Sequence, residues 1–255
     1  LEDLYEDIAE RMVGDITFIF SKEEYPKAIA ILTNFGYSKV HDTTYDFPSF
    51  KHHPRLQKVN NIAAVEIHKE LLLEEFAHEF NYAIIQKDSQ KMNDINILSF
   101  ENQLALSIIA KQINDDGFHY KNIALRNAYD VFLLSKRTNA IVAFDKFNKL
   151  KKPLNCFLAS CYEVFNLPKS LEYNNTHEIE TYLNTFDEYL NDIILRNKHH
   201  KKTRRKLFIK TRLDIIYKSL FDKAHRNWLI KRTTDKNWYK EKLVQVGLKK
   251  PKSNF

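Results

Sequence analysis

The chain of 255 residues is long enough for one large domain or two small ones, and its 44% content of hydrophobic residues is sufficient for a buried core. No apolar run approaches the roughly 20 residues needed to cross a bilayer, and no charged-then-apolar signal segment opens the chain, so we expect no membrane partner and a cytoplasmic location. Four scattered glycines exclude a Rossmann fingerprint and a Walker loop, and two cysteines five positions apart exclude a disulfide framework.

Charge is divided unevenly along the chain, whose formal net charge is +7. Residues 196–255 carry 20 Lys and Arg against 4 Asp and Glu, whereas residues 1–195 carry 20 against 29. Such asymmetry suggests an acidic partner for the basic end, which could be nucleic acid, an anionic surface or the acidic half of the same molecule.

The N-terminal pattern predicts a strand followed by a helix. Residues 2–12 resemble the end of a helix, and residues 14–20 alternate as a strand. One face of that strand carries Ile16, Phe18 and Phe20 and is interpreted as the core face, so Asp15 and Thr17 lie on the other face. Ser21 with Glu24 then predicts the start of an amphipathic helix that Gly36 stops.

Residues 37–68 predict further strands. Residues 37–50 are rich in Thr, Tyr and Phe and indicate one or two strands, broken by prolines. In residues 62–68, Val65 and Ile67 point one way, whereas Ala64, Glu66 and His68 point the other. A carboxylate therefore again lies on the polar face of a strand.

After Glu70 the pattern of apolar residues becomes that of long helices, at roughly 71–80, 100–114, 120–136, 138–149, 153–166, 176–195 and 203–232. The fold class predicted is α+β: a small mixed sheet with flanking helices, followed by an all-helical part. We place the two domains at 1–90 and 91–255.

Two strands that each present a carboxylate away from the core match the needs of metal-dependent phosphoryl or nucleotidyl transfer. Mg²⁺ takes oxygen ligands, usually one or two carboxylates with substrate phosphates and water. Two such ions, about 4 Å apart, can hold the attacking and leaving oxygens of an in-line displacement. Asp15 and Glu66 are thus the candidate catalytic and metal-binding residues, for Mg²⁺ or Mn²⁺.

The order of these motifs resembles a known family. Arg11 precedes the run from Gly14 to Thr17, the next helix closes on Phe-Gly-Tyr at 35–37, and a later strand reads Val-Glu-Ile-His at 65–68. This arrangement is similar to the uncharacterised nucleotidyltransferase family of bacteria, a branch of the DNA polymerase β-like superfamily. The resemblance implies transfer of a nucleoside monophosphate from an NTP to an unknown acceptor.

Carried over by position, the resemblance makes Asp15 the first metal-binding acid and Glu66 the third. Thr17 stands where the family has a second Asp, and a neutral hydroxyl cannot supply that charge. A catalytically impaired protein that keeps the fold as a binding or regulatory module is therefore the alternative. The family's upstream Gly-Ser element, which grips the triphosphate, is expected before Leu1.

Other candidates are open to two interpretations. Arg11 could contact phosphate or only satisfy carbonyls at a helix end, and His68 could orient Glu66, contact substrate or be an ordinary polar residue. With Thr17, these two are the candidate substrate-binding residues. Two adjacent histidines, at 52 and 53, do not face the same way on a strand, which argues against a metal site there.

The basic end offers a third hypothesis, binding of nucleic acid through residues 196–252. Against it, apolar residues at helical spacing predict a buried seam, and the aromatic residues are interpreted as core rather than as stacking platforms. The seam consists of Leu213, Ile216, Leu220, Ala224 and Trp228. In residues 120–136, we expect Arg126 to pair with Asp130 at the i,i+4 spacing.

Overall fold

The computed structural model describes residues 4–7, 10–11, 14–40, 47–73 and 75–245, without side chains from 241 onward. Close packing divides the chain into two units, residues 1–41 with 51–203 and residues 42–50 with 204–255. The fold is α+β, as predicted. The boundary predicted between residues 90 and 91 falls inside the first unit, whose main core takes side chains from both sides of that position.

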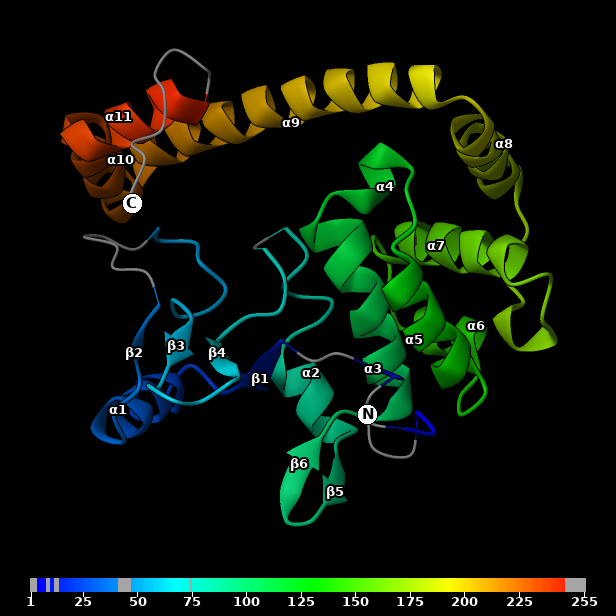
Figure 1. Cartoon of the computed structure of the whole chain (residues 1–255), viewed down its shortest axis with the longest axis horizontal. Coiled ribbons are helices and arrows are strands. Elements are labelled where there is room, and N and C mark those ends of the chain that lie inside the picture. Colours follow the sequence, from blue (N-terminus) through cyan, green and yellow to red (C-terminus); the bar gives the residue numbers. More distant parts are fainter. Residues whose placement is uncertain (1–3, 8–9, 12–13, 41–46, 74, 246–255) are drawn as a thin grey trace. The chain divides into compact units, whose positions relative to one another are not determined.

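Four strands form a mixed sheet in the order β1-β4-β3-β2 (Figure 1). Strands β1 (Asp15–Ile19) and β4 (Ala64–His68) pair in parallel, whereas β3 (Leu56–Gln57) runs antiparallel to both β4 and β2 (Ser38–Lys39). Parallel neighbours need a crossover connection, which contains helix α1 (Tyr25–Asn34). The two strands that carry the candidate acids are therefore adjacent in one sheet.

Helix α1 starts and stops at the predicted signals. The backbone N–H of Glu24 donates to Oγ of Ser21 at 3.2 Å. At the other end Gly36 has a φ of 84°, and the N–H of Tyr37 donates to the carbonyl of Leu32. A glycine adopts this left-handed conformation without steric cost, which ends the helix and turns the chain toward β2.

One face of the sheet packs against α1. Leu56, Val65 and Ile67 are buried there, joined by partly buried side chains of α1 and its flanks. The prediction that Ile16 and Phe18 are core residues is wrong, since they are 45% and 41% exposed. Strand β1 is the edge strand, so its apolar face has a neighbouring strand on one side only.

The segment between the sheet and the helices differs from the sequence prediction. Residues 71–80, predicted as a helix, form turns among the described residues, and helix α2 (Tyr82–Lys87) follows. A hairpin of β5 (Gln90–Met92) and β6 (Ile95–Ile97) was not predicted. Its turn residues Asn93 and Asp94 both have positive φ, as a two-residue type I′ turn requires.

The helical part of the first unit confirms most of the predicted segments, with shorter ends. It comprises α3 (Phe100–Ile109) continued by the π-helix η2 (Ala110–Asn114), α4 (Gly117–Tyr120), α5 (Leu125–Ser135), α6 (Ala140–Asp145), α7 (Lys151–Val164), the 3-10 helix η3 (Lys169–Leu171) and α8 (His177–Asn191). Helix α7 is its centre, because residues 153–161 are all buried. Its two cysteines, Cys156 and Cys161, are free and buried, as predicted, and burial raises the pKa of both thiols.

A carboxylate that the sequence did not single out holds the turn that leads into α7. Glu79 is buried and accepts hydrogen bonds from the backbone N–H groups of Asn148, Lys149 and Leu150, at 2.8, 2.9 and 3.2 Å. Burial acts to raise the pKa of Glu79, but the three hydrogen bonds outweigh it and the pKa is lowered. The ionised side chain therefore satisfies three successive N–H groups of the turn that leads into α7.

The predicted helix 203–232 consists of two helices. Helix α9 (Ile193–Phe221) ends where Asp222 accepts from the backbone N–H of His225 and caps α10 (Lys223–Thr234), which α11 (Lys236–Gln245) follows. Within the second unit, the ring of Phe47 packs edge-on against Trp228, with 4.7 Å between centroids.

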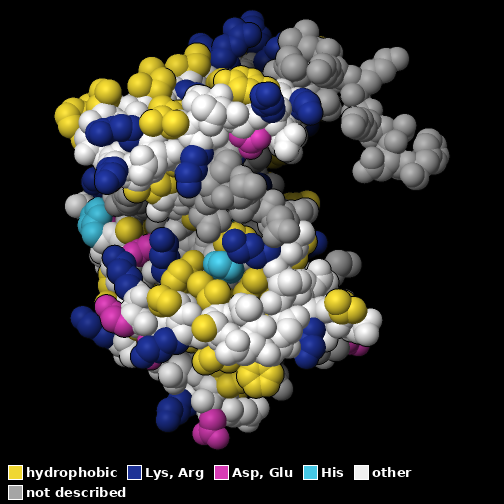
Figure 2. Space-filling model, turned by 90° about the vertical axis from the view of Figure 1, so that its left-hand side faces the viewer, with side chains coloured by type: hydrophobic (Ala, Val, Ile, Leu, Met, Phe, Trp, Pro, Cys, Tyr) yellow, Lys and Arg dark blue, Asp and Glu magenta, His cyan; other side chains and the backbone are white. Residues whose placement is uncertain are grey.

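The buried seam predicted along these helices is wrong for most of its members. Leu213, Ile216, Leu220 and Ala224 are exposed, and Trp228 is partly buried. Figure 2 shows yellow apolar and blue basic side chains interspersed on the surface of the C-terminal helices. The helical spacing of these apolar residues identifies a stripe along the helices but does not show whether other side chains pack against it. None of the described helices combines the length and apolarity needed to span a membrane.

Candidate active site

Asp15 and Glu66 project from the same face of the sheet. In the parallel register, Asp15 lies opposite Ala64, and Thr17 lies opposite Glu66. Since strand side chains alternate, Asp15, Thr17, Glu66 and His68 all point away from the face that α1 covers. The polar face predicted for each strand is therefore one continuous face.

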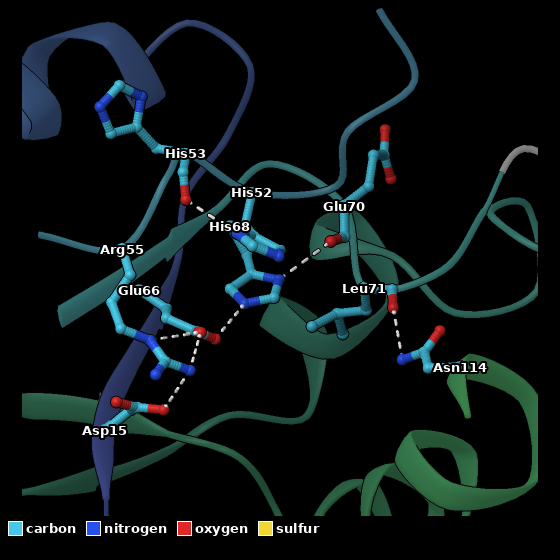
Figure 3. A network of polar contacts seen from close by, with 9 residues as sticks. All are labelled: Asp15, His52, His53, Arg55, Glu66, His68, Glu70, Leu71 and Asn114. Atoms are coloured by element: carbon cyan, nitrogen blue, oxygen red, sulfur yellow. Dashed lines mark hydrogen bonds and ion pairs between the residues drawn. The ribbon is translucent and has the colours of Figure 1, made fainter. Parts of the chain in front are cut away.

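A third charged residue joins them. Leu56 pairs with Val65 in the antiparallel register, so Arg55, one residue before β3, lies across from Glu66. Its Nη2 atom lies 2.8 Å from Oδ2 of Asp15 and 2.9 Å from Oε1 of Glu66, and its Nε lies 3.2 Å from the same Oε1. Figure 3 shows the two carboxylates converging on this guanidinium.

The second oxygen of Glu66 faces a pair of histidines. Nε2 of His68 lies 3.4 Å from Oε2 of Glu66, and Nδ1 of His68 lies 3.3 Å from the carbonyl oxygen of Glu70 (Figure 3). The ring of His52 lies against that of His68, with 4.8 Å between centroids. His68 is thus placed to orient Glu66, one of the two roles that the sequence left open.

The environment of Glu66 favours its ionised form. The hydrogen bond with His68 lowers its pKa most, burial opposes this, and the hydrogen bond with Arg55 lowers it further, to about 2. In return, the bond with Glu66 raises the pKa of Arg55. At neutral pH the site therefore holds an ionised Glu66 beside a permanent cation.

The donor set fits a divalent cation. Two carboxylate oxygens already meet at one cationic nitrogen, and the exposed side chain of Thr17 lies opposite Glu66. Mg²⁺ is a hard cation that takes such oxygens at about 2.0–2.1 Å and keeps several waters or phosphate ligands. Among the described residues no group of three or more His, Cys, Asp or Glu is arranged to hold a metal. Further ligands would have to come from water or substrate.

The site is open to solvent, as substrate entry requires. The Arg55 side chain is 48% exposed, although the two carboxylates that it bridges are 26% and 19% exposed. Two surface hollows, of about 380 and 310 Å³, lie elsewhere and contain none of these residues.

Arg11 is bound to another carboxylate. Its Nη2 and Nε lie 2.9 and 3.0 Å from the two oxygens of Asp130 on α5, which also accepts from the hydroxyl of Tyr5. The predicted pairing of Arg126 with Asp130 is therefore wrong. A substrate contact of Arg11 remains a prediction. Arg11 lies four residues before Asp15, so its ion pair with Asp130 attaches the chain just before β1 to helix α5.

The sequence interpretation missed Arg55 and the contact of His52 with His68. Both depend on how residues 52–57 pair with β4, where β3 is only two residues long. The signal that could have found Arg55 is an arginine just before a strand antiparallel to the strand of Glu66.

Comparisons with known proteins agree with the motifs. The model of a family described as uncharacterised nucleotidyltransferase matches residues 1–167. The match includes the sheet, the two acids, Arg55 and the helices as far as α7. No curated protein and no solved structure matches the chain.

Proposed function

Because the chain belongs to the uncharacterised nucleotidyltransferase family, we propose that it transfers a nucleoside monophosphate from an NTP to an acceptor, with Mg²⁺ or Mn²⁺ held by Asp15 and Glu66. One observation carries the proposal: carboxylates from two strands converge on a single cationic nitrogen in an open site. Carboxylate oxygens and their negative charge suit a divalent ion bound with a triphosphate.

In the transfer, a nucleophilic oxygen or nitrogen of the acceptor bonds to the α-phosphorus. The bond from that phosphorus to the α–β bridging oxygen breaks, pyrophosphate leaves with the electron pair, and the acceptor proton passes to solvent. A metal ion held here would stabilise the developing negative charge. Asp15 and Glu66 position it from rigid strands, and His68 orients Glu66.

Thr17 favours a competing version, in which the fold binds nucleotide without turnover. The exposed hydroxyl opposite Glu66 adds an oxygen but no charge, so the site has one negative charge fewer than the family pattern provides. Turnover by the unmodified chain at ordinary metal concentration contradicts this version. Activity that appears only in Thr17→Asp supports it.

The test measures binding first and turnover second. At about 100 times Kd, a metal and NTP pair stabilises the protein by about 2.7 kcal/mol. For a chain of this size that raises Tm by about 5–10 °C. We expect this shift with at least one NTP in the presence of Mg²⁺ or Mn²⁺, and release of pyrophosphate once the acceptor is supplied.

Asp15→Asn and Glu66→Gln should abolish the shift, because each removes one of the converging charges. Asp145→Asn is the matched control, since its exposed carboxylate pairs with Lys151 on the surface, and it should keep the shift. Absence of any metal-dependent shift with all four NTPs in the wild type refutes the proposal.

A second candidate function, binding of single-stranded nucleic acid, is favoured by the surface of the second unit. Residues 204–255 carry 16 Lys and Arg against 4 Asp and Glu. Three aromatic side chains there are exposed: Phe208 by 56%, Tyr217 by 65% and Phe221 by 75%. Exposed rings among basic side chains provide both stacking and phosphate contacts.

This candidate predicts affinity for labelled single-stranded DNA or RNA that falls steeply with salt. Replacing Phe208, Tyr217 and Phe221 with Ala should weaken binding, since stacking contributes about 1–3 kcal/mol per base. Phe35→Ala is the control, because that ring is equally exposed at the end of α1. Affinity that is insensitive to salt, or equal in both variants, contradicts it.

A further inference from the structure

Arg55 occupies the point at which a metal ion would have to bind. Its Nη2 atom contacts Oδ2 of Asp15 and Oε1 of Glu66 at 2.8 and 2.9 Å. A divalent ion ligated by the same two oxygens, at about 2.1 Å from each, would need the space between them that the guanidinium nitrogen now fills. The two cations therefore exclude one another.

Arg55 cannot yield this position by losing its proton, because a guanidinium stays charged at all accessible pH values. It must move as a cation. The side chain is long and 48% exposed, and it extends from the residue that precedes β3, so its far end can leave the carboxylates while its backbone stays in the sheet.

A triphosphate offers the displaced guanidinium a new partner. Its oxygens are anionic, and the planar fork of an arginine binds phosphate through two parallel hydrogen bonds as well as it binds a carboxylate. Without such a partner, displacement by metal alone leaves a cation beside the metal. The exchange is thus unfavourable for metal alone and favourable for metal with nucleotide.

We propose that Arg55 is a displaceable internal cation, which holds Asp15 and Glu66 together before substrate binds and then transfers to the NTP phosphates as the metal takes its place. The inference rests on the proposed function and deepens it. It makes metal and nucleotide bind cooperatively, and it makes Arg55 a nucleotide-binding residue.

The experiment measures three affinities by calorimetry at one pH and salt: Mn²⁺ alone, NTP alone in chelator, and NTP with Mn²⁺ in excess. In Arg55→Met the competitor is absent, so Mn²⁺ alone should bind about tenfold more tightly than in the wild type. The same variant should bind the NTP about tenfold more weakly in the presence of Mn²⁺. Changes of opposite sign are not expected from a merely structural arginine, whose loss would weaken both.

Two further variants keep the result interpretable. Arg55→Lys retains the charge but lacks the planar guanidinium. Its affinity for Mn²⁺ alone should be near that of the wild type, and its affinity for the nucleotide should lie between those of the wild type and Arg55→Met. Arg126→Met replaces an exposed arginine of α5 and should match wild type in all three measurements. Should Arg55→Met fail to fold, as judged by circular dichroism, Arg55→Lys carries the nucleotide comparison.

The outcomes separate this inference from the proposed function. If the wild type binds NTP with Mn²⁺ but Arg55→Met binds Mn²⁺ alone no more tightly than the wild type, displacement of Arg55 is refuted and the proposed function stands. If Arg55→Lys, correctly folded, binds the nucleotide as tightly as wild type, the fork has no role and the inference also fails. A wild type that binds neither Mn²⁺ nor NTP with Mn²⁺ overturns both.

Discussion

Replacing Asp130 with Asn should loosen the attachment of the N-terminal segment to helix α5. The Asp130 carboxylate is 5% exposed and is bound through both oxygens to Arg11, which is 21% exposed, and to the hydroxyl of Tyr5. Burial and this carboxylate together raise the pKa of Tyr5, so Tyr5 stays a neutral donor. The variant leaves Arg11 half-paired in a mostly buried place.

The expected loss of stability follows from how deeply the ion pair of Asp130 with Arg11 is buried. Breaking a buried ion pair costs about 3–5 kcal/mol, whereas an exposed pair contributes about 0–1 kcal/mol. Because the side chain of Arg11 keeps about a fifth of its exposure and Asn still accepts one hydrogen bond, we expect a loss of about 2–3 kcal/mol. Urea denaturation followed by circular dichroism measures it, and Tm should fall by about 5–10 °C.

The matched control is Asp145→Asn, which breaks the exposed pair of Asp145 with Lys151 and should cost under about 1 kcal/mol. A double-mutant cycle of Asp130→Asn with Arg11→Met isolates the pair and should give a coupling energy of about 1–3 kcal/mol. Strictly additive effects, or a loss no larger than that of the control, would refute the reasoning from burial.

Two further predictions concern carboxylates that stay ionised in the folded chain. Glu79→Gln should destabilise the protein by about 1–2 kcal/mol in urea, since the buried acceptor of three N–H groups before α7 loses its charge, and a change below about 0.5 kcal/mol would contradict this. The pKa of Glu66 is lowered from 4.5 to about 2, so its interactions stabilise the fold fully above pH 4.5 and are lost as the pH falls toward 2. Over that range Tm of the wild type should fall more steeply than Tm of Glu66→Gln, and parallel curves would contradict the assignment.

The placement of Asp15 and Glu66 on one face of the sheet could be predicted because side chains along a strand alternate every second residue. Alternation places each acid on the polar face of its strand, and the family resemblance, which makes both acids ligands of one metal site, implies that the two strands are neighbours. Arg55 could not be predicted in this way. Its position depends on the pairing of the two-residue strand β3 with β4, and two residues are too few to show the alternation that identifies a strand.

Long-range partners explain the other failures. The i,i+4 rule offered Arg126 as the partner of Asp130, but a bidentate contact with Arg11, 119 positions earlier, occupies that carboxylate. Periodicity likewise marked the stripe through Leu213 and Ile216 without showing whether anything packs on it. The hairpin at 90–97 escaped because its strands are three residues each and its turn lacks glycine.

Thr17 and Arg55 are best understood as parts of one charge balance. Asp15 and Glu66 contribute two negative charges, which one guanidinium reduces to a net single negative charge. An Asp at position 17, directly opposite Glu66, would leave a net charge of two even with Arg55 in place, and like charges across a strand pair repel. With Thr there, a single internal cation suffices to hold the acids together before substrate binds. On the proposed exchange of Arg55 for metal, Thr17 should lower the affinity for metal alone and, for the same reason, make the arrival of the triphosphate decisive for metal binding.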